Sequence, residues 1–279
     1  MKSLRSIAFV VNDGKAGAPA LARELMAISR AGGARVRLTS HFPFAPKFLK
    51  GADACCVIGG DGTLLGAARE AALAGIPIIG VNRGSLGFLT TFSADEARAG
   101  FAKVLAGEFS VDRRAMLDCH VPGNSQGKDL ALNDVLIKAE ENSRLVRLEV
   151  WADGELVTEY LCDGLIFSTA TGSTAYNLSA GGPIIHPCAD VIAMTPICPH
   201  TLSNRAIIFR GDVKIEVRNR SPEEALFVSW DGRRDAIAKS EKPIKIKMAR
   251  TRLSLAQKAS YEHFAVVRAK LKWTGGLTP

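Results

Sequence analysis

The sequence has no long apolar run and no pair of cysteines at metal-binding spacing, and these absences exclude several classes of protein. No stretch approaches the roughly 20 apolar residues that span a membrane. The six cysteines include no Cys-x-x-Cys pair and the five histidines are equally dispersed, so we expect neither a zinc site nor a disulfide framework. The apolar segment at residues 7–11 is too short for a signal peptide. We therefore expect a soluble protein of the cytoplasm.

Aromatic residues are also scarce, at 6%, whereas positive charge is in excess, with a formal net charge of +8. Residues 233–272 hold twelve Lys and Arg against three Asp and Glu. No aromatic interleaving and no known nucleic-acid module accompany this charge, so we expect no nucleic-acid partner. The basic segment suits small polyanions such as nucleotides, or forms a solvated surface.

Strand and helix signals alternate in the first part of the chain. Strand-like runs lie at residues 7–11, 36–38, 54–58 and 78–81, and helix-like runs lie at residues 18–30, 63–73 and from a cap at Ser93 or Asp95 to Leu105. This alternation predicts an α/β domain with a parallel sheet over residues 1–112. The ligand site of such a sheet lies at the carboxyl ends of its strands.

Alternating strand patterns dominate after residue 112. Asp153-Gly154 and Asp231-Gly232 are hairpin signals between such strands. We expect a β-sandwich over residues 113–255, interrupted by one helix at residues 173–179. The remaining residues, 256–279, form a basic tail with a helix-like segment.

The segment Gly-Gly-Asp-Gly-Thr at residues 59–63 follows an apolar run and precedes a helix-like run. A strand, a glycine turn and a helix N-terminus together make an anion site. Asp61 would repel phosphate there unless it holds a metal or takes a proton, so the loop indicates phosphoryl transfer. The alternative is a tight turn in which Asp61 caps the helix. We assign the phosphate loop to Gly59, Gly60, Gly62 and Thr63.

Two further segments carry groups suited to a nucleotide. Asn133 and Asp134 open an apolar strand and offer an amide and a carboxylate, which suit an adenine edge and ribose hydroxyls. A turn is the alternative for this pair. Residues 163–183 contain a strand, a turn rich in Thr, Gly and Ser, a short helix and a Gly-Gly-Pro stop. Their hydroxyls and free N–H groups make a second polar nest, where Tyr176 can stack or hydrogen-bond.

Together these segments resemble the NAD kinase family, whose members phosphorylate NAD to NADP. The resemblance covers nearly the whole chain in family order and rests on blocks at residues 59–63, 80–89, 133–134, 171–183 and 195–205. The first block is shared with lipid kinases and similar to phosphofructokinase loops, whereas the last two blocks are much more specific. The resemblance implies an α/β domain like that of phosphofructokinases and diacylglycerol kinases, then a β-sandwich, with the C-terminal tail returning to the first domain.

The resemblance also implies roles for individual residues. Asp61 matches the family's proton acceptor for the 2′-hydroxyl of the adenosine ribose. Residues that match family contacts with NAD are Asp61, Gly62, Asn133, Asp134, Arg144, Asp163, Thr174, Ala175, Tyr176, Asn177, Leu178, Ser179 and Arg233. Among these, Asn133 and Asp134 match the pair that binds adenosine, and Asp163 matches a residue near the nicotinamide. The implied partners are NAD and ATP, with Mg²⁺ or another divalent cation accompanying the donor, no metal site of the protein itself, and a homodimer or homotetramer.

The chain departs from the family pattern at three places. Asp134 stands where Glu is usual, Thr169-Ala170-Thr171-Gly172 stands where Thr-Pro-Thr-Gly is usual, and Leu161 and Cys162 stand where many members have a polar residue. The last departure leaves the choice between NAD and NADH open, and the sequence also leaves ATP against polyphosphate open. The alternatives are a lipid or sugar kinase with the same glycine loop, or a non-catalytic dinucleotide sensor, against which the intact Asp61 argues.

Overall fold

The computed structural model describes residues 2–84, 87–124, 129–141, 145–201, 203–239, 242–258 and 261–273. The chain divides into two compact units. The first consists of Met1–Arg113 with Leu253–Pro279, and the second consists of Arg114–Arg252. Both ends of the chain therefore contribute to the first unit, and the middle of the chain forms the second.

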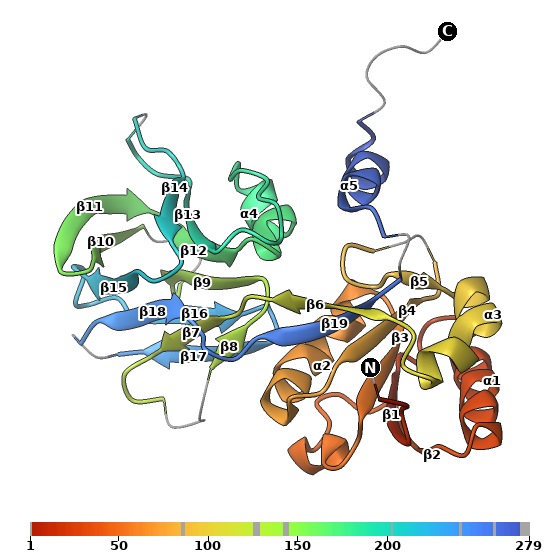
Figure 1. Cartoon of the computed structure of the whole chain (residues 1–279). Helices are drawn as coiled ribbons and strands as arrows, with labels where there is room; N and C mark the ends of the chain where they lie inside the picture. The colour runs from red at the N-terminus through yellow and green to blue at the C-terminus, as the bar shows by residue number, and fades with distance from the viewer. Residues whose placement is uncertain are drawn as a thin grey trace, which may run out of the picture. The chain divides into compact units, whose positions relative to one another are not determined.

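The first unit is built on a mainly parallel sheet (Figure 1). Its strands lie in the order β2-β1-β3-β4-β19-β6, with β5 beside β4. Their bounds are β1 Ser6–Val11, β2 Arg35–Thr39, β3 Ala54–Gly59, β4 Ile78–Asn82, β5 Phe92–Ser93, β6 Ser110–Arg114 and β19 Leu253–Gln257. Strands β3 and β4 are buried along their whole length, as expected for uninterrupted apolar strands covered on both faces. Strand β19 pairs in parallel with β4, so the chain returns to this sheet after the second unit.

Helices cover both faces of this sheet (Figure 1). They are α1 Ala18–Ala31, α2 Asp61–Ala74 and α3 Ala94–Leu105, with a 3-10 turn η1 at Pro46–Leu49. Helix α5, His263–Leu271, follows β19 and stands apart from the sheet in Figure 1. Leu21 and Leu25 of α1 and Phe101 of α3 share one apolar cluster with Phe9 and Ile58 of the strands. Helix α3 begins with a capping box, because Ser93 Oγ accepts from Glu96 N at 3.2 Å and Glu96 Oε2 accepts from Ser93 N at 2.8 Å.

The second unit contains two antiparallel sheets (Figure 1). The sheet orders are β11-β10-β15-β18-β7-β8 and β14-β13-β12-β9-β16-β17. The strands are β7 Leu117–His120, β8 Leu130–Ala131, β9 Asp134–Ala139, β10 Val146–Ala152, β11 Glu155–Cys162, β12 Gly164–Thr169, β13 Val191–Ile197, β14 Ile207–Arg210, β15 Lys214–Asn219, β16 Leu226–Trp230, β17 Arg234–Ala238 and β18 Ile244–Met248. Alternate residues of both sheets, such as Leu148, Ile215, Phe167 and Trp230, form one buried core. This is the predicted β-sandwich.

Local predictions from the sequence are confirmed in several places. Asp153-Gly154 joins β10 to β11 and Asp231-Gly232 joins β16 to β17, with positive φ at all four residues. Four of the cysteines are buried and all six are free thiols, so the buried four serve as small core residues. Burial raises the pKa of Cys55 to about 12. Over the part of the chain that the structure describes, no helix combines the length and apolarity needed to cross a membrane.

One predicted element is different in the structure. Residues 173–179 form two short pieces, η2 Gly172–Thr174 and α4 Tyr176–Ser179, separated at Ala175. The amide of Asn177 explains the break, because its Nδ2 donates to the carbonyl of Ser173 at 3.1 Å. In a continuous helix, a backbone N–H would occupy that carbonyl.

Candidate active site

The glycine loop of the first unit lies at the carboxyl end of β3, as the sequence predicts for a ligand site of a parallel sheet. Gly59 is the last residue of β3 and Gly60 occupies the N-cap of α2. Asp61 is therefore the first residue of the helix and does not cap it. Thr63 is buried below the loop, and its hydroxyl accepts a long hydrogen bond of 3.5 Å from Gly60 N.

The carboxylate of Asp61 holds a second loop. Its Oδ2 accepts from Phe88 N at 2.8 Å, and its Oδ1 accepts from Leu89 N at 3.2 Å, from Thr90 N at 3.0 Å and from Thr90 Oγ1 at 3.0 Å. A carboxylate has about four acceptor positions, two on each oxygen. Oδ1 is therefore fully used, whereas Oδ2 retains the capacity to accept one more hydrogen.

The residues around Asp61 fix this arrangement. Asn82 Nδ2 donates to Thr90 Oγ1 at 2.9 Å, so Asn82, Thr90 and Asp61 form a chain of hydrogen bonds. A Cβ added at Gly87 would lie 2.0 Å from Asp61 Oδ1, so only glycine fits there. The sequence analysis did not identify Thr90 or Asn82 as part of the site. Asn82 lies within the block at residues 80–89 that carries the family resemblance, and Thr90 follows that block directly.

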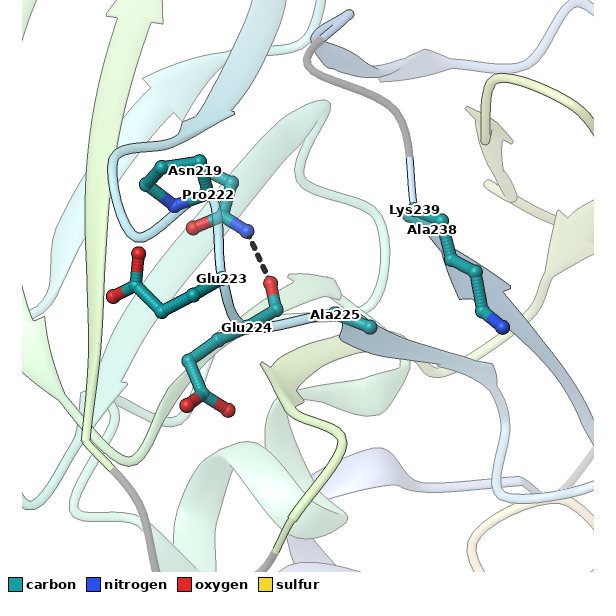
Figure 2. Close-up of a pocket in the computed structure, with 7 residues that line it drawn as sticks. All are labelled: Asn219, Pro222, Glu223, Glu224, Ala225, Ala238 and Lys239. Atoms are coloured by element: carbon teal, nitrogen blue, oxygen red, sulfur yellow. Dashed lines mark hydrogen bonds between the residues drawn. The ribbon is translucent and has the colours of Figure 1, made fainter.

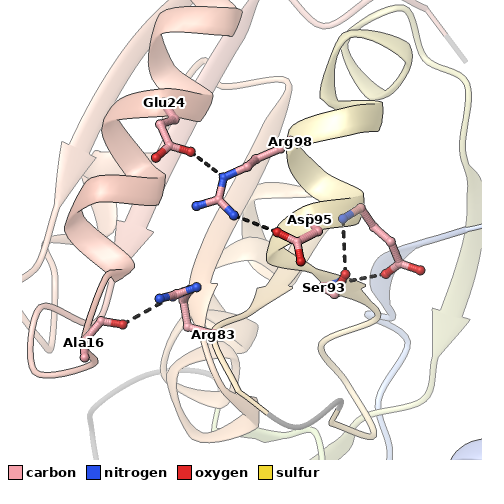
Figure 3. A network of polar contacts seen from close by, with 7 residues as sticks. Ala16, Glu24, Arg83, Ser93, Asp95 and Arg98 are labelled. Atoms are coloured by element: carbon pink, nitrogen blue, oxygen red, sulfur yellow. Dashed lines mark hydrogen bonds and ion pairs between the residues drawn. The ribbon is translucent and has the colours of Figure 1, made fainter.

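The loop that follows β1, at residues 12–17, lies beside the glycine loop of the first unit. Asn12 follows β1, and its Nδ2 donates to Thr63 Oγ1 at 3.3 Å. Lys15 reaches the glycine loop itself, since a Cβ added at Gly60 would lie 2.9 Å from Lys15 Nζ. Arg83 anchors the loop from the end of β4 by donating from Nε to the carbonyl of Ala16 at 3.3 Å (Figure 3). A positive charge therefore lies against the predicted phosphate loop, which sequence reasoning did not find.

Glu24 and Asp95 also belong to this side of the first unit. Arg98 of α3 donates to Glu24 of α1 at 2.6 Å and to Asp95 at 2.9 Å (Figure 3). The hydrogen bond from Arg98 lowers the pKa of the exposed Glu24 carboxyl. The pair with Glu24 joins α1 to α3 at the surface, whereas the pair with Asp95 lies within α3, and neither supplies a group to the glycine loop.

In the second unit, the structure brings Asn133 and Asp134 together with the turn at the end of β12. Strands β9 and β12 are antiparallel neighbours that pair Asp134 with Ser168. Thr169 N donates to the carbonyl of Asn133 at 2.9 Å, and Thr169 Oγ1 donates to the carbonyl of Leu132 at 2.6 Å. A Cβ at Gly172 would lie 2.0 Å from the carbonyl oxygen of Asn133, which explains why glycine occupies this position.

Asp134 and Asp231 place two carboxyl groups close together at this end of the sandwich. The side chain of Asp134 is buried, and burial followed by the negative charge of Asp231 raises its pKa to about 7. Burial also raises the pKa of Asp231, although backbone N–H donors and Arg234 act in the opposite direction. Asp134 is therefore an acid that changes its charge near neutral pH.

The predicted dinucleotide-binding run at residues 174–179 contains both exposed and buried side chains. Tyr176 is 44% exposed and available to a ligand. Asn177 is fully buried, and its amide is used inside the protein: Nδ2 donates to the carbonyls of Ser173 and Pro183, and Oδ1 accepts from Thr195 Oγ1 at 2.7 Å. Asn177 therefore ties the turn together. Its predicted contact with NAD remains a prediction, as do those of Thr174, Ala175, Leu178 and Ser179.

The remaining predicted residues fall in three places. Arg233 lies in the turn between β16 and β17, and this turn adjoins Asn133 because Trp230 pairs with Val135. Asp163 precedes β12 and is thus at the opposite end of that strand from Thr169, about 20 Å away for six residues of extended chain. Cys198 forms a side-chain hydrogen bond with Asp163, and this bond raises the pKa of the thiol. Arg144 lies outside the described residues.

Pockets also occur away from these residues. Figure 2 shows one of about 220 Å³ in the second unit, lined by Asn219, Pro222, Glu223, Glu224, Ala225, Ala238 and Lys239. Asn219 Nδ2 donates there to the carbonyl of Glu224 at 2.6 Å. The lining contains none of the predicted site residues, so this pocket does not mark the predicted nucleotide site.

Metal ligands are sparse in the structure. No three His, Cys, Asp or Glu side chains gather as a possible metal site among the described residues. Mg²⁺ commonly binds one or two carboxylates and substrate phosphates instead of an all-protein cage. Asp61 is the carboxylate of the glycine loop, and four hydrogen bonds from residues 88–90 already occupy most of its acceptor positions.

The sequence matches known families over most of its length. Residues 40–109 match the ATP-NAD kinase N-terminal domain, and residues 132–257 match the ATP-NAD kinase C-terminal domain. The NAD kinase of Geotalea daltonii is 43% identical over 224 residues, which are 80% of this chain and 79% of that protein. The NAD kinase of Geobacter sulfurreducens is 42% identical over 224 residues, which are again 80% of this chain and 79% of that protein.

Solved structures share the fold. A yeast NADH kinase complexed with NADH matches with a TM-score of 0.83 at 23% identity, covering 100% of this chain and 91% of that one. An NAD kinase from Archaeoglobus fulgidus in complex with ATP matches with a TM-score of 0.79 at 23% identity, and the match covers 97% of this chain and 100% of that one.

A glycine loop with a central carboxylate on a parallel sheet, followed in the chain by a β-sandwich, defines a kinase of the nucleotide-binding class. The sequence identities make the assignment specific. The chain belongs to the NAD kinase family and is an NAD kinase enzyme. The comparisons support neither a lipid or sugar kinase nor a non-catalytic sensor.

Proposed function

We propose that this protein transfers the terminal phosphoryl group of ATP to the 2′-hydroxyl of the adenosine ribose of NAD, with Asp61 as the proton acceptor. The observation that carries the proposal is the Asp61 carboxylate in the glycine loop, with an Oδ2 that accepts one hydrogen bond from the residues that the structure describes. A ribose hydroxyl is a weak nucleophile at neutral pH, so a carboxylate within hydrogen-bond reach accelerates its attack on phosphorus. The four hydrogen bonds from residues 88–90 hold that carboxylate in one orientation.

The donor binds, in this proposal, at the loop of Gly59, Gly60, Gly62 and Thr63. Backbone N–H groups at the N-terminus of α2 are available to phosphate oxygens there, and the Lys15 ammonium beside Gly60 adds a positive charge. A divalent cation bound to the triphosphate would neutralise charge on the transferred group. The acceptor position that remains on Asp61 Oδ2 is assigned to the ribose hydroxyl, so in this proposal the phosphate oxygens of the donor hold the cation.

The dinucleotide binds through Asn133 and Asp134, with Tyr176 beside the same turn. The carboxamide of Asn133 makes no hydrogen bond within the described residues and is free to meet an adenine edge. Asp134 is suited to ribose hydroxyls, and Arg233 and Asp163 are further proposed contacts. The yeast relative is named for NADH, and Leu161 and Cys162 supply no polar group near Asp163, so we treat NADH as a second possible substrate.

We further propose a homodimer or homotetramer in the cytoplasm, where free NAD and ATP are both present. Light scattering on the purified protein would measure its mass in solution. A monomer at micromolar concentration would contradict the proposed assembly.

The activity is tested by incubating the purified protein with NAD, ATP and Mg²⁺ and following NADP with an NADP-specific dehydrogenase. We expect NADP only when all three are present, and loss of turnover with excess EDTA. Parallel reactions with NADH, with polyphosphate, and with diacylglycerol or a hexose determine the acceptor and the donor. Binding of NAD without any NADP would contradict the proposal.

A further inference from the structure

Asp231 caps the backbone of the segment that carries Asn133 and Asp134. Its Oδ2 accepts from Leu132 N at 2.9 Å, and its Oδ1 accepts from Asn133 N at 2.7 Å and from Asp134 N at 3.2 Å. In return, Asp231 N donates to the carbonyl of Asp134 at 3.0 Å. Three successive N–H groups thus converge on one carboxylate, in the manner of a backbone anion nest filled by the protein itself.

The same segment is held from its other side by the turn after β12. Thr169 N and Ser168 Oγ both donate to the carbonyl of Asn133, at 2.9 and 3.3 Å. The N–H and C=O of Asn133 are therefore both committed to the protein. Recognition of a ligand by Asn133 is left to its side chain, whose position depends on this backbone.

The arrangement includes one feature that ordinarily destabilises a protein. The φ of 55° at Asp231 and of 59° at Gly232 is the conformation that a tight hairpin turn requires, and the Asp153-Gly154 turn has it as well. The Asp231 carboxyl, however, lies beside that of Asp134, and their negative charges repel. A simple hairpin requires neither a second acid nor a cap on the neighbouring strand, so the turn alone does not account for Asp231.

We infer that Asp231 is a positioning residue for the dinucleotide: its carboxylate holds Leu132, Asn133 and Asp134 so that the Asn133–Asp134 pair is formed before NAD binds. The inference rests on the proposed role of that pair in binding adenosine. Asp231 itself need not contact NAD. Preorganisation of this kind increases affinity because binding then orders fewer groups.

Two substitutions at Asp231 separate the cap from the turn. Asp231→Asn tolerates the left-handed backbone and keeps one acceptor oxygen, but its amide group faces one of the three N–H donors. Asp231→Gly is unstrained in the turn and removes the cap entirely. Asp153 offers a matched control, because Asp153-Gly154 also has positive φ at both residues and Asp153 Oδ1 accepts from Lys214 N at 3.0 Å, at a hairpin without predicted site residues.

The measurements are kcat, the KM for NAD, the dissociation constant for NAD by calorimetry, and the unfolding free energy in urea. We expect Asp231→Asn to raise the KM and dissociation constant for NAD roughly tenfold, the effect of one hydrogen bond of about 1.4 kcal/mol. Asp231→Gly should raise both further, while kcat changes much less. Asp153→Asn and Asp153→Gly should lower stability without changing the KM for NAD. Asp231 variants that lose stability but keep the wild-type KM would overturn the inference.

A double-mutant cycle with Asp134→Asn distinguishes this inference from the function on which it rests. If Asp231 acts through the pair, the effects of Asp134→Asn and Asp231→Asn on NAD binding are not additive. Additive effects would show that Asp231 acts elsewhere and would contradict the inference. If Asp134→Asn alone leaves NAD binding unchanged, the proposed binding pair is wrong and the inference falls with it.

Discussion

The raised pKa of Asp134 predicts an unusual dependence of stability on pH. Folding buries this carboxyl beside Asp231 and raises its pKa from an ordinary 3.8 to about 7. The folded protein therefore binds a proton at this position more tightly than the unfolded chain does. Linkage then requires that Asp134 lowers stability progressively as pH rises from about 4 to 7, with no further change above 7.

The substitution that isolates this effect is Asp134→Asn, which keeps the shape of the side chain and removes its charge. Each pH unit within the window corresponds to about 1.4 kcal/mol, so the full cost approaches about 4 kcal/mol above pH 7. Between pH 5 and pH 7.5 the unfolding free energy of the wild type should fall relative to that of Asp134→Asn by about 3 kcal/mol.

Urea denaturation of both proteins without ligand at several pH values measures this difference directly. Glu216→Gln is a control with the opposite sign, since the hydrogen bond from Arg218, aided by Lys245, lowers the pKa of Glu216. The unfolding free energy of the wild type should rise relative to that of Glu216→Gln as pH rises through the acid range up to about 4.5. A difference between wild type and Asp134→Asn that is constant from pH 5 to pH 7.5 would refute the argument.

Three further predictions follow from other contacts. Lys15→Met should raise the KM for ATP roughly 10- to 100-fold, because it removes a charged contact of about 1.5–3 kcal/mol, and should leave the KM for NAD unchanged. As a control, Lys103→Met at an exposed position should change neither KM. Gly172→Ala should lower the unfolding free energy in urea by about 1–3 kcal/mol and raise the KM for NAD, because its Cβ meets the carbonyl of Asn133; unchanged values would place the close approach in doubt. Ser93→Ala should lower stability by about 1 kcal/mol through loss of the cap on α3 and leave both KM values unchanged, and a change in catalysis would contradict a purely structural cap.

Much of the fold was predictable because local signals and tertiary structure agree. The apolar runs that became β3 and β4 are fully buried, and Ser93 with Glu96 forms the cap that the sequence indicates. Strand β19 was not predicted to join the first sheet, because its place beside β4 depends on a pairing between residues far apart in the chain. The break within residues 173–179 was also missed, since the tie from Asn177 to Ser173 and Pro183 leaves no local signature.

The site shows the same division. The glycine loop and the Asn133–Asp134 pair were identified from residue type and order, and each lies at the end of a strand, where a ligand can reach it. Thr90, Lys15 and Asp231 were not identified as site residues, because each acts through a contact with a residue distant in sequence. Asp231 was predicted only as part of a hairpin turn, which is correct but incomplete.

The central mechanistic claim, that Asp61 accepts the proton of the ribose hydroxyl, is tested most directly by Asp61→Asn. With its carbonyl oxygen in the place of Oδ1, asparagine keeps three of the four hydrogen bonds and loses only that from Phe88 N, so the fold should lose no more than about 1.5–3 kcal/mol.

The decisive measurement is the rate of NADP formation by folded Asp61→Asn at saturating NAD and ATP, with NAD affinity determined by calorimetry on the same sample. We predict that kcat falls by roughly 10²–10⁴-fold, because an amide cannot take the proton, while the affinity for NAD changes far less. A kcat close to that of the wild type would contradict the assignment of Asp61 as the base and would leave the alignment of the substrates as the source of catalysis.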